Sequence, residues 1–155
     1  FLMKLLVGYP DRAAELAMLD LPGVADPLPG PLPPPLFGPA EVRSLRARAK
    51  AVHVAPAIKE YVVDLVRATR DPDAYGLNLG PLIELGASPR ATLALIRSAQ
   101  AHALLSGRDY VVPHDVKALA RDVLRHRLLV SYEADAEGLS ADDLLLRVLG
   151  HIRVP

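Results

Sequence analysis

A proline-rich stretch between Leu21 and Pro39 constrains the fold of this 155-residue chain more than any other feature. Eight of its 19 residues are proline and three are glycine. Proline lacks an amide hydrogen and fixes φ, so neither a helix interior nor a paired strand tolerates such a density. The stretch therefore predicts an extended, semi-rigid linker between two differently folded parts of the chain.

The residues before the linker predict one strand and one helix. Phe1–Val7 is a short apolar run closed by glycine and proline, which is typical of a strand. Asp11 is placed to cap a helix over Arg12–Leu19. A lone strand leaves its backbone unpaired, so we expect residues 1–19 to be frayed, paired with another copy, or laid irregularly on the rest.

After the linker, apolar residues recur at helical spacing almost to the end of the chain. Prolines at first helical positions and Ser140 at a capping position mark helix starts, and Gly107 marks a stop. Residues 71–85 are expected to form a loop. Five helices are predicted, beginning near residues 40, 56, 89, 113 and 140. The fold class is therefore all-α, a helical bundle preceded by one strand and one helix left over from another fold.

Composition and charge exclude several classes of function. Lys and Arg balance Asp and Glu at 18 each, so the net charge gives no argument for binding nucleic acid or a membrane surface. The chain has no cysteine, which excludes disulfides and thiolate metal sites and fits a reducing compartment. The five histidines show no pairing at helical spacing, so no metal site is predicted.

The segment Gly86–Arg90 is the strongest candidate for a binding site. A helix start carries partial positive charge and unpaired amides, and it favours an acid in its first turn, yet here that turn holds Arg90. Ser88 can cap the helix, and Gly86 lets the backbone come close to a ligand. Together these features suit a phosphate. The alternative is an exposed arginine after an ordinary Ser-Pro cap.

Four segments of this chain resemble, in the same order and spacing, the C-terminal lid of the MoxR family of AAA+ ATPases. The N-terminal strand and the helix near Tyr61 also resemble that family, as the last core strand and the helix before the lid. The position before Pro113, often Thr in the family, is Val112 here, which cannot cap a helix with its side chain. The four segments are Leu85–Ala91, Gly107–Val111, Pro113–Lys117 and Val123–Leu128.

The resemblance implies a role for the candidate segment. In the family the corresponding arginine is sensor 2, which contacts nucleotide phosphates from the lid, and here that position is Arg90. Arg90 is thus expected to be catalytic, with Gly86, Ser88 and Arg90 contacting ATP and no metal ligand in this chain. ATP and Mg²⁺ would be held by an ATPase core, because no Gly-x-x-x-x-Gly-Lys-Ser/Thr motif occurs here.

The resemblance also implies an organisation and partners. Residues 1–20 would be the end of the αβα core, 21–39 the linker, 40–85 connecting helices and 86–155 the lid. The parent protein would be a cytoplasmic homo-hexamer in which the lid meets the core of its own or a neighbouring subunit. Its clients would be von Willebrand factor A domain proteins, remodelled in a chaperone-like way or loaded with a metal cofactor. Nucleic acid and membranes are not expected partners.

Two further readings stay open at the level of sequence. The chain could be a stand-alone helical interaction module that binds a partner through its arginine-rich face and hydrolyses nothing. DNA binding through a helical pair is disfavoured by the zero net charge. Arg127 could reach a nucleotide or a neighbouring subunit, or it could simply favour the dipole at a helix C-terminus.

Overall fold

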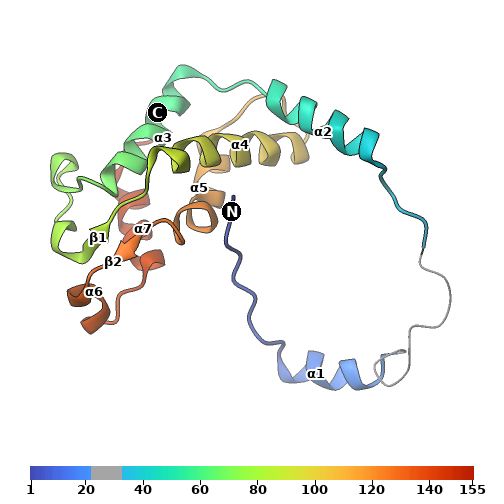
Figure 1. The fold of residues 1–155 in the computed structure, drawn as a ribbon, viewed down its shortest axis with the longest axis horizontal. Helices are drawn as coiled ribbons and strands as arrows, with labels where there is room; N and C mark the ends of the chain where they lie inside the picture. Colours follow the sequence, from blue (N-terminus) through green and yellow to red (C-terminus); the bar gives the residue numbers. More distant parts are fainter. Residues whose placement is uncertain (22–32) are drawn as a thin grey trace.

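The computed structural model describes residues 1–21 and 33–155. Helices dominate these residues, with two 3₁₀ turns and a two-stranded sheet, so the predicted all-α class is confirmed (Figure 1). In chain order the elements are α1 (Arg12–Leu19), α2 (Pro39–Ala51), α3 (Pro56–Ala68), η1 (Asp73–Tyr75), η2 (Gly80–Leu82), β1 (Ile83–Leu85), α4 (Pro89–Leu105), α5 (Pro113–Leu124), β2 (Leu129–Val130), α6 (Tyr132–Ala136) and α7 (Ala141–His151).

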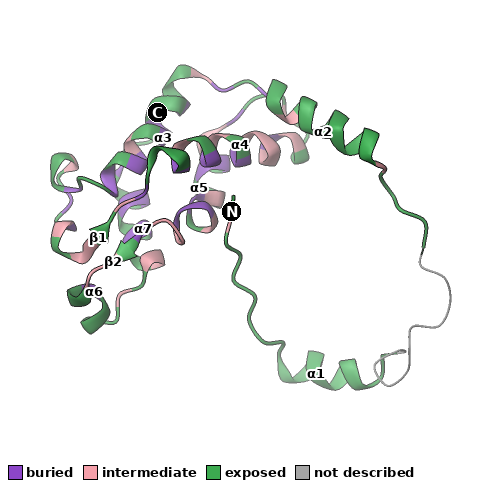
Figure 2. Cartoon of the chain, viewed as in Figure 1, coloured by how far each residue is buried: buried purple, intermediate pink, exposed green. Residues whose placement is uncertain are grey.

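The hydrophobic core lies between α3, α4, α5 and α7. Helix α4 packs against α3 and α5, and α7 closes the bundle against α3 and α5. The buried residues shown in Figure 2 gather on the facing sides of these four helices. Their amphipathic spacing is what the sequence predicts, since apolar residues three and four apart share one face. The largest fully buried side chains include Leu65, Leu95, Leu124, Leu144 and Leu145.

Helices α1 and α2 contribute no buried residue of their own to this core. Helix α1 stands apart from the bundle in Figure 1, and α2 lies along α4. The apolar face expected on α2 is largely open, because Val42 and Leu45 remain 44% and 38% exposed. Its C-terminal end is held by Gln100, whose side-chain amide donates to the carbonyl oxygen of Val52 at 2.8 Å.

The N-terminal strand is a correction to the sequence prediction. Residues 1–10 have neither helix nor strand, because no second strand lies beside them in the described part of the chain. Instead, the Lys4 amide donates to the carbonyl oxygen of Asp122 at 2.8 Å, at the end of α5. Figure 1 shows this end of the chain beside α5. The expectation of an irregular segment laid on the bundle is therefore met by residues 1–4, and α1 follows as predicted with Asp11 as its cap.

The structure also differs from prediction in residues 71–85 and after α5. Residues 71–85, expected to be a loop, contain two 3₁₀ turns and the strand β1, which pairs antiparallel with β2. Helix α5 ends at Leu124 rather than near Leu128, and the unpredicted α6 follows. In the linker, residues 22–32 lie outside the described residues, while 33–38 form no helix or strand.

Candidate functional site

One face of α4 lines an arginine-rich hollow of about 480 Å³. The face has the spacing i, i+3, i+4 and i+7, which places its residues in one stripe along the helix. The first two residues of the chain and one arginine after α5 form the opposite side. The lining residues are Phe1, Leu2, Arg90, Leu93, Ala94, Arg97 and Arg127.

A close backbone contact fixes where α4 begins. A Cβ at Gly86 would lie 2.2 Å from the carbonyl oxygen of Thr69, so only glycine fits there. The next amide, that of Ala87, donates to the Thr69 hydroxyl at 2.9 Å, and that hydroxyl donates to the Val66 carbonyl at 2.7 Å. Thr69 is fully buried. The start of α4, and with it Arg90, is thus set by the end of α3.

Ser88 occupies the N-cap position with extended backbone, φ −74° and ψ 168°. Its side chain nevertheless accepts no hydrogen bond, so the side-chain cap expected from the sequence is absent. The first turn of α4 contains no acid either. Ser88 and Arg90 are both exposed, and the Ala91 amide donates to the Ser88 carbonyl at 2.8 Å.

Arg97 and Arg127 join Arg90 at the hollow. Arg97 escaped the sequence analysis, although its position seven residues after Arg90 places it on the same helix face. Arg127 is half-buried, and its Nε donates to the Val123 carbonyl at 2.9 Å. Within the described residues none of the three forms a salt bridge. Three unneutralised guanidinium groups around one hollow favour an anionic ligand.

Two other arginines of the bundle, Arg108 and Arg125, are paired with carboxylates, unlike those of the hollow. Arg125 contacts Asp122 at 2.8 Å and Asp142 at 3.0 Å. Arg108 donates to both carboxylate oxygens of Asp115, at 2.8 Å and 2.5 Å. Such paired side chains hold helices together, and their charge is already satisfied. They are therefore structural, in contrast to the arginines of the hollow.

The Asp115 carboxylate is fully buried at the start of α5. It accepts hydrogen bonds from Arg108, from the Val112 amide at 2.8 Å, and contacts His102 Nδ1 at 2.6 Å. Burial alone would raise the pKa of Asp115, but these hydrogen bonds lower it well below its ordinary value. Asp115 also supplies the cap contact that the side chain of Val112 cannot make.

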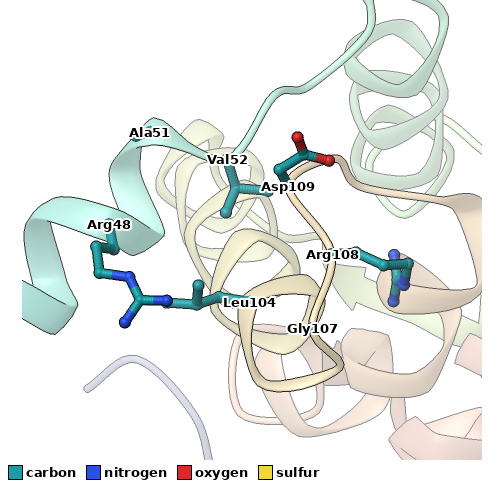
Figure 3. A pocket seen from close by; sticks show the side chains of 7 residues that line it. All are labelled: Arg48, Ala51, Val52, Leu104, Gly107, Arg108 and Asp109. Carbon is teal, nitrogen blue, oxygen red and sulfur yellow. The ribbon is translucent and has the colours of Figure 1, made fainter.

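A second hollow, of about 560 Å³, lies between the end of α2 and the turn after α4 (Figure 3). Arg48 reaches over Leu104 at its rim, and Arg108 points away from Arg48. Because Arg108 is bound to Asp115, this hollow presents one free arginine together with Asp109. Its charges nearly balance, so it is the weaker candidate for an anion.

His126 lies between the two arginines that follow α5. Both of its ring nitrogens are buried and have no hydrogen-bond partner among residues 1–21 and 33–155. Burial lowers the pKa of His126, and the positive charge of Arg127 lowers it further. His126 therefore adds no positive charge near neutral pH, and the charge on this side of the hollow is that of Arg127.

No group of three or more acidic or histidine side chains is arranged to hold a metal ion in residues 1–21 and 33–155. Over the same ranges, no helix combines the length and apolar character needed to cross a membrane.

Comparison with known proteins shows which proteins this chain is similar to. Residues 78–148 match the family model of the AAA lid domain. The whole chain is 38% identical over 156 residues to the chaperone MoxR1 of Mycobacterium tuberculosis and 36% identical over 155 residues to YeaC of Bacillus subtilis. It covers 40% and 45% of those two proteins. A segment of 94 residues, 56% of the chain, is 43% identical to MoxR of Paracoccus denitrificans and covers 28% of it.

A solved structure shares the fold over the full length of the chain. It is that of a Cytophaga hutchinsonii protein provisionally named an ATPase, with a TM-score of 0.86 and 32% sequence identity. The match covers all of this chain and 47% of that protein. The chain thus spans less than half the length of the relatives it matches.

These matches identify the part of the helical bundle within residues 78–148 as an AAA lid domain. The chain belongs to the MoxR family of AAA+ ATPases and corresponds to the C-terminal part of its members.

Proposed function

We propose that this chain is the nucleotide-sensing lid of an ATP-hydrolysing MoxR protein and that Arg90 is its sensor. The observation that carries the proposal is the hollow where Arg90, Arg97 and Arg127 converge without a carboxylate partner among the described residues. Isolated cations at one hollow repel one another, so an anion between them relieves an unfavourable interaction. The phosphates of a nucleotide carry that charge.

The geometry at the start of α4 supports a role for Arg90 in particular. Its backbone belongs to the first turn of a helix, where the dipole is positive and no acid is present, and its guanidinium adds a cation there. Ser88 is exposed there and can donate its hydroxyl, since that hydroxyl has no other hydrogen bond. Gly86 acts indirectly, because its close approach to Thr69 fixes the position of this turn. Arg90 and Ser88 are thus the ligand contacts, and Gly86 positions them.

In this proposal the reaction itself depends on residues outside the chain. ATP with its Mg²⁺ supplies the phosphoryl group that water attacks. The arginines fit the phosphates, whereas the described residues offer no cluster of metal ligands, so the metal is assigned to the ATPase core. Arg90 stabilises the negative charge that grows on the transferring phosphoryl group.

The lid then communicates the state of the nucleotide to the rest of an assembly. We place the lid against the core of its own or a neighbouring subunit in a homo-hexameric ring. The ring would act on von Willebrand factor A domain proteins in chaperone-like remodelling or metal-cofactor insertion. The support is the family alone, together with the name of MoxR1 as a chaperone. We assign the complex to the cytoplasm.

Replacing Arg90 tests the sensor role. Arg90→Ala in the full-length protein should reduce ATP turnover about tenfold or more, because an interaction with the transition state is lost. Nucleotide affinity should change less than turnover. The lid should still fold, since Arg90 is exposed and its removal ends an unfavourable interaction with the helix dipole. Turnover, affinity and melting temperature are measured on one preparation.

A matched control is Arg121→Ala, which removes an exposed arginine from α5 outside the hollow. It should leave turnover unchanged. Equal turnover in Arg90→Ala and Arg121→Ala, with both proteins folded, contradicts the sensor role. The chain would then be better explained as an interaction module that acts through its arginine-rich face.

A further inference from the structure

Two histidines lie close together where α4 packs against α5. His102 lies in the last turns of α4, and His114 is the second residue of α5. The centroids of their imidazole rings are 6.4 Å apart, and the ring planes are tilted by 56°. The two residues belong to different helices, so the spacing of histidines along the sequence does not predict the pair, and the packing of α4 on α5 creates it.

The ring of His102 is oriented by a carboxylate that solvent does not reach. Its Nδ1 lies 2.6 Å from Oδ1 of Asp115, whose side chain is fully buried, whereas the side chain of His102 is 33% exposed. An ionised carboxylate at this distance favours the neutral tautomer in which Nδ1 carries the hydrogen, so Nε2 keeps its lone pair. His102 therefore presents a fixed acceptor nitrogen near the protein surface.

This arrangement is the one that histidine ligands of metal ions have in proteins. Such a histidine almost always donates its other ring N–H to a carboxylate or a carbonyl, which orients the ring and makes the free nitrogen a stronger ligand. Asp115 has this position relative to His102. The Asp115 carboxylate also balances the charge of Arg108, which donates to both of its oxygens. The Arg108–Asp115 pair beside His102 thus carries no net charge that would repel a cation.

His114 is placed to supply the second ligand. Two imidazoles on a tetrahedral zinc ion have ring centroids about 5 Å apart, given a Zn–N distance of about 2.1 Å. The centroids here are 6.4 Å apart, so one ring has to approach the other by about 1 Å. His114 is exposed, and rotation about its side-chain bonds provides a movement of this size.

We propose that His102 and His114 bind one divalent transition-metal ion, which joins α4 to α5, and that Asp115 orients His102 for this role. Imidazole nitrogen suits zinc, copper and nickel, whereas Mg²⁺ prefers oxygen ligands, so this ion differs from the Mg²⁺ assigned to the ATPase core. Water completes the coordination, because the described residues arrange no third histidine or acidic ligand at this place. The inference does not depend on the nucleotide-sensing role of Arg90.

Zinc affinity of the full-length protein tests the site. It is measured without nucleotide, by competition with a chromophoric chelator. His102→Asn keeps an amide donor for Asp115 in the place of Nδ1 but removes Nε2, and His114→Ala removes an exposed side chain. Loss of an outer partner of a metal ligand costs 10–100-fold in affinity, so loss of either ligand should weaken zinc binding about tenfold or more.

The matched control is His151→Ala, which removes a histidine from α7 whose Nε2 is already engaged with the Tyr75 carbonyl at 2.8 Å. It should bind zinc as the unchanged protein does. Zinc should also raise the melting temperature of the unchanged protein and of His151→Ala more than that of His102→Asn or His114→Ala, because a ligand of the folded state stabilises it.

Electron paramagnetic resonance of bound Cu²⁺ identifies the ligands directly. With copper below the protein concentration, the spectrum of the unchanged protein should show coupling to two imidazole nitrogens, and that of His114→Ala to one. Equal zinc affinity in the unchanged protein, His102→Asn and His114→Ala overturns the proposal. So does a copper spectrum that His114→Ala leaves unchanged, and the contact of His102 with Asp115 is then purely structural.

Discussion

At the scale of single residues, the position of the candidate site depends on one glycine and one threonine. Gly86 lies so close to the end of α3 that its missing side chain is what allows the contact. Thr69, fully buried, satisfies the Ala87 amide that would otherwise be buried without a partner. Arg90 is surface-exposed four residues further on. Gly86 thus fixes the position of the helix start that carries the proposed ligand contacts.

Gly86→Ala is expected to destabilise the lid by about 2 kcal/mol or more, because the added methyl group collides with backbone that cannot move aside. Its Cβ would lie 2.2 Å from the Thr69 oxygen and 2.6 Å from the Arg70 Cα. The melting temperature should fall by roughly 4–8 °C. Gly150→Ala in α7 is the matched control, since nothing lies within 4 Å of its Cβ position. A Gly86→Ala protein that melts with or above the unchanged one contradicts the close contact.

At the scale of elements, α4 and α5 are joined both by apolar packing and by one buried ionic cluster. Helix α4 brings His102, the turn after it brings Arg108, and α5 brings Asp115. This ionic cluster spans the turn at Gly107, whose φ is +74°. Because Arg90 and Arg97 lie on α4 and Arg127 follows α5, this joint determines the shape of the hollow between them.

Asp115→Asn is expected to lower the free energy of unfolding by about 3 kcal/mol, since Arg108 loses its charged partner in a buried setting. Urea unfolding measures this change. The control is Asp109→Asn, which replaces an exposed carboxylate and should change the free energy of unfolding by no more than about 0.5 kcal/mol.

The stability that Asp115 contributes to the folded protein is expected to decrease as the pH falls. The pKa of Asp115 is lower in the folded protein than the ordinary 3.8, so the unfolded chain binds the proton first. The contribution of Asp115 is complete above that value and declines as the pH falls below it. Asp115→Asn should therefore lose less stability than the unchanged protein between pH 5 and pH 3, and an equal loss contradicts the ionic cluster.

At the scale of the whole molecule, the chain combines a compact helical bundle with two segments that bury little against it, residues 1–10 and α1. Helix α1 has no buried residue, and its Leu19 is 74% exposed. Among residues 1–10 of the described chain, hydrogen bonds to the bundle are made by Phe1, Leu2 and Lys4. The chain spans less than half of the length of its relatives.

The 155-residue chain alone is expected to hydrolyse no ATP. Three arginines can bind phosphates, but they provide neither a loop to cradle the triphosphate nor ligands for Mg²⁺. Release of inorganic phosphate from ATP by the purified chain is compared with a buffer blank and repeated after a second purification. Turnover that persists through repurification would place a hydrolytic site within these residues and overturn the assignment of hydrolysis to a separate core.

The sequence by itself determined all the helices of the described residues except α6, and where they start, because caps, prolines and apolar spacing act within a few residues. Asp11 and Ser140 cap as predicted, and Gly107 ends α4 with positive φ. Tertiary structure decided what depends on distant partners. Phe1–Val7 has strand-forming residues but no neighbouring strand, so it became an arm on α5. The hollow is likewise tertiary, since α4 supplies Arg90 and Arg97, while Arg127 comes from beyond α5, and only packing brings them together.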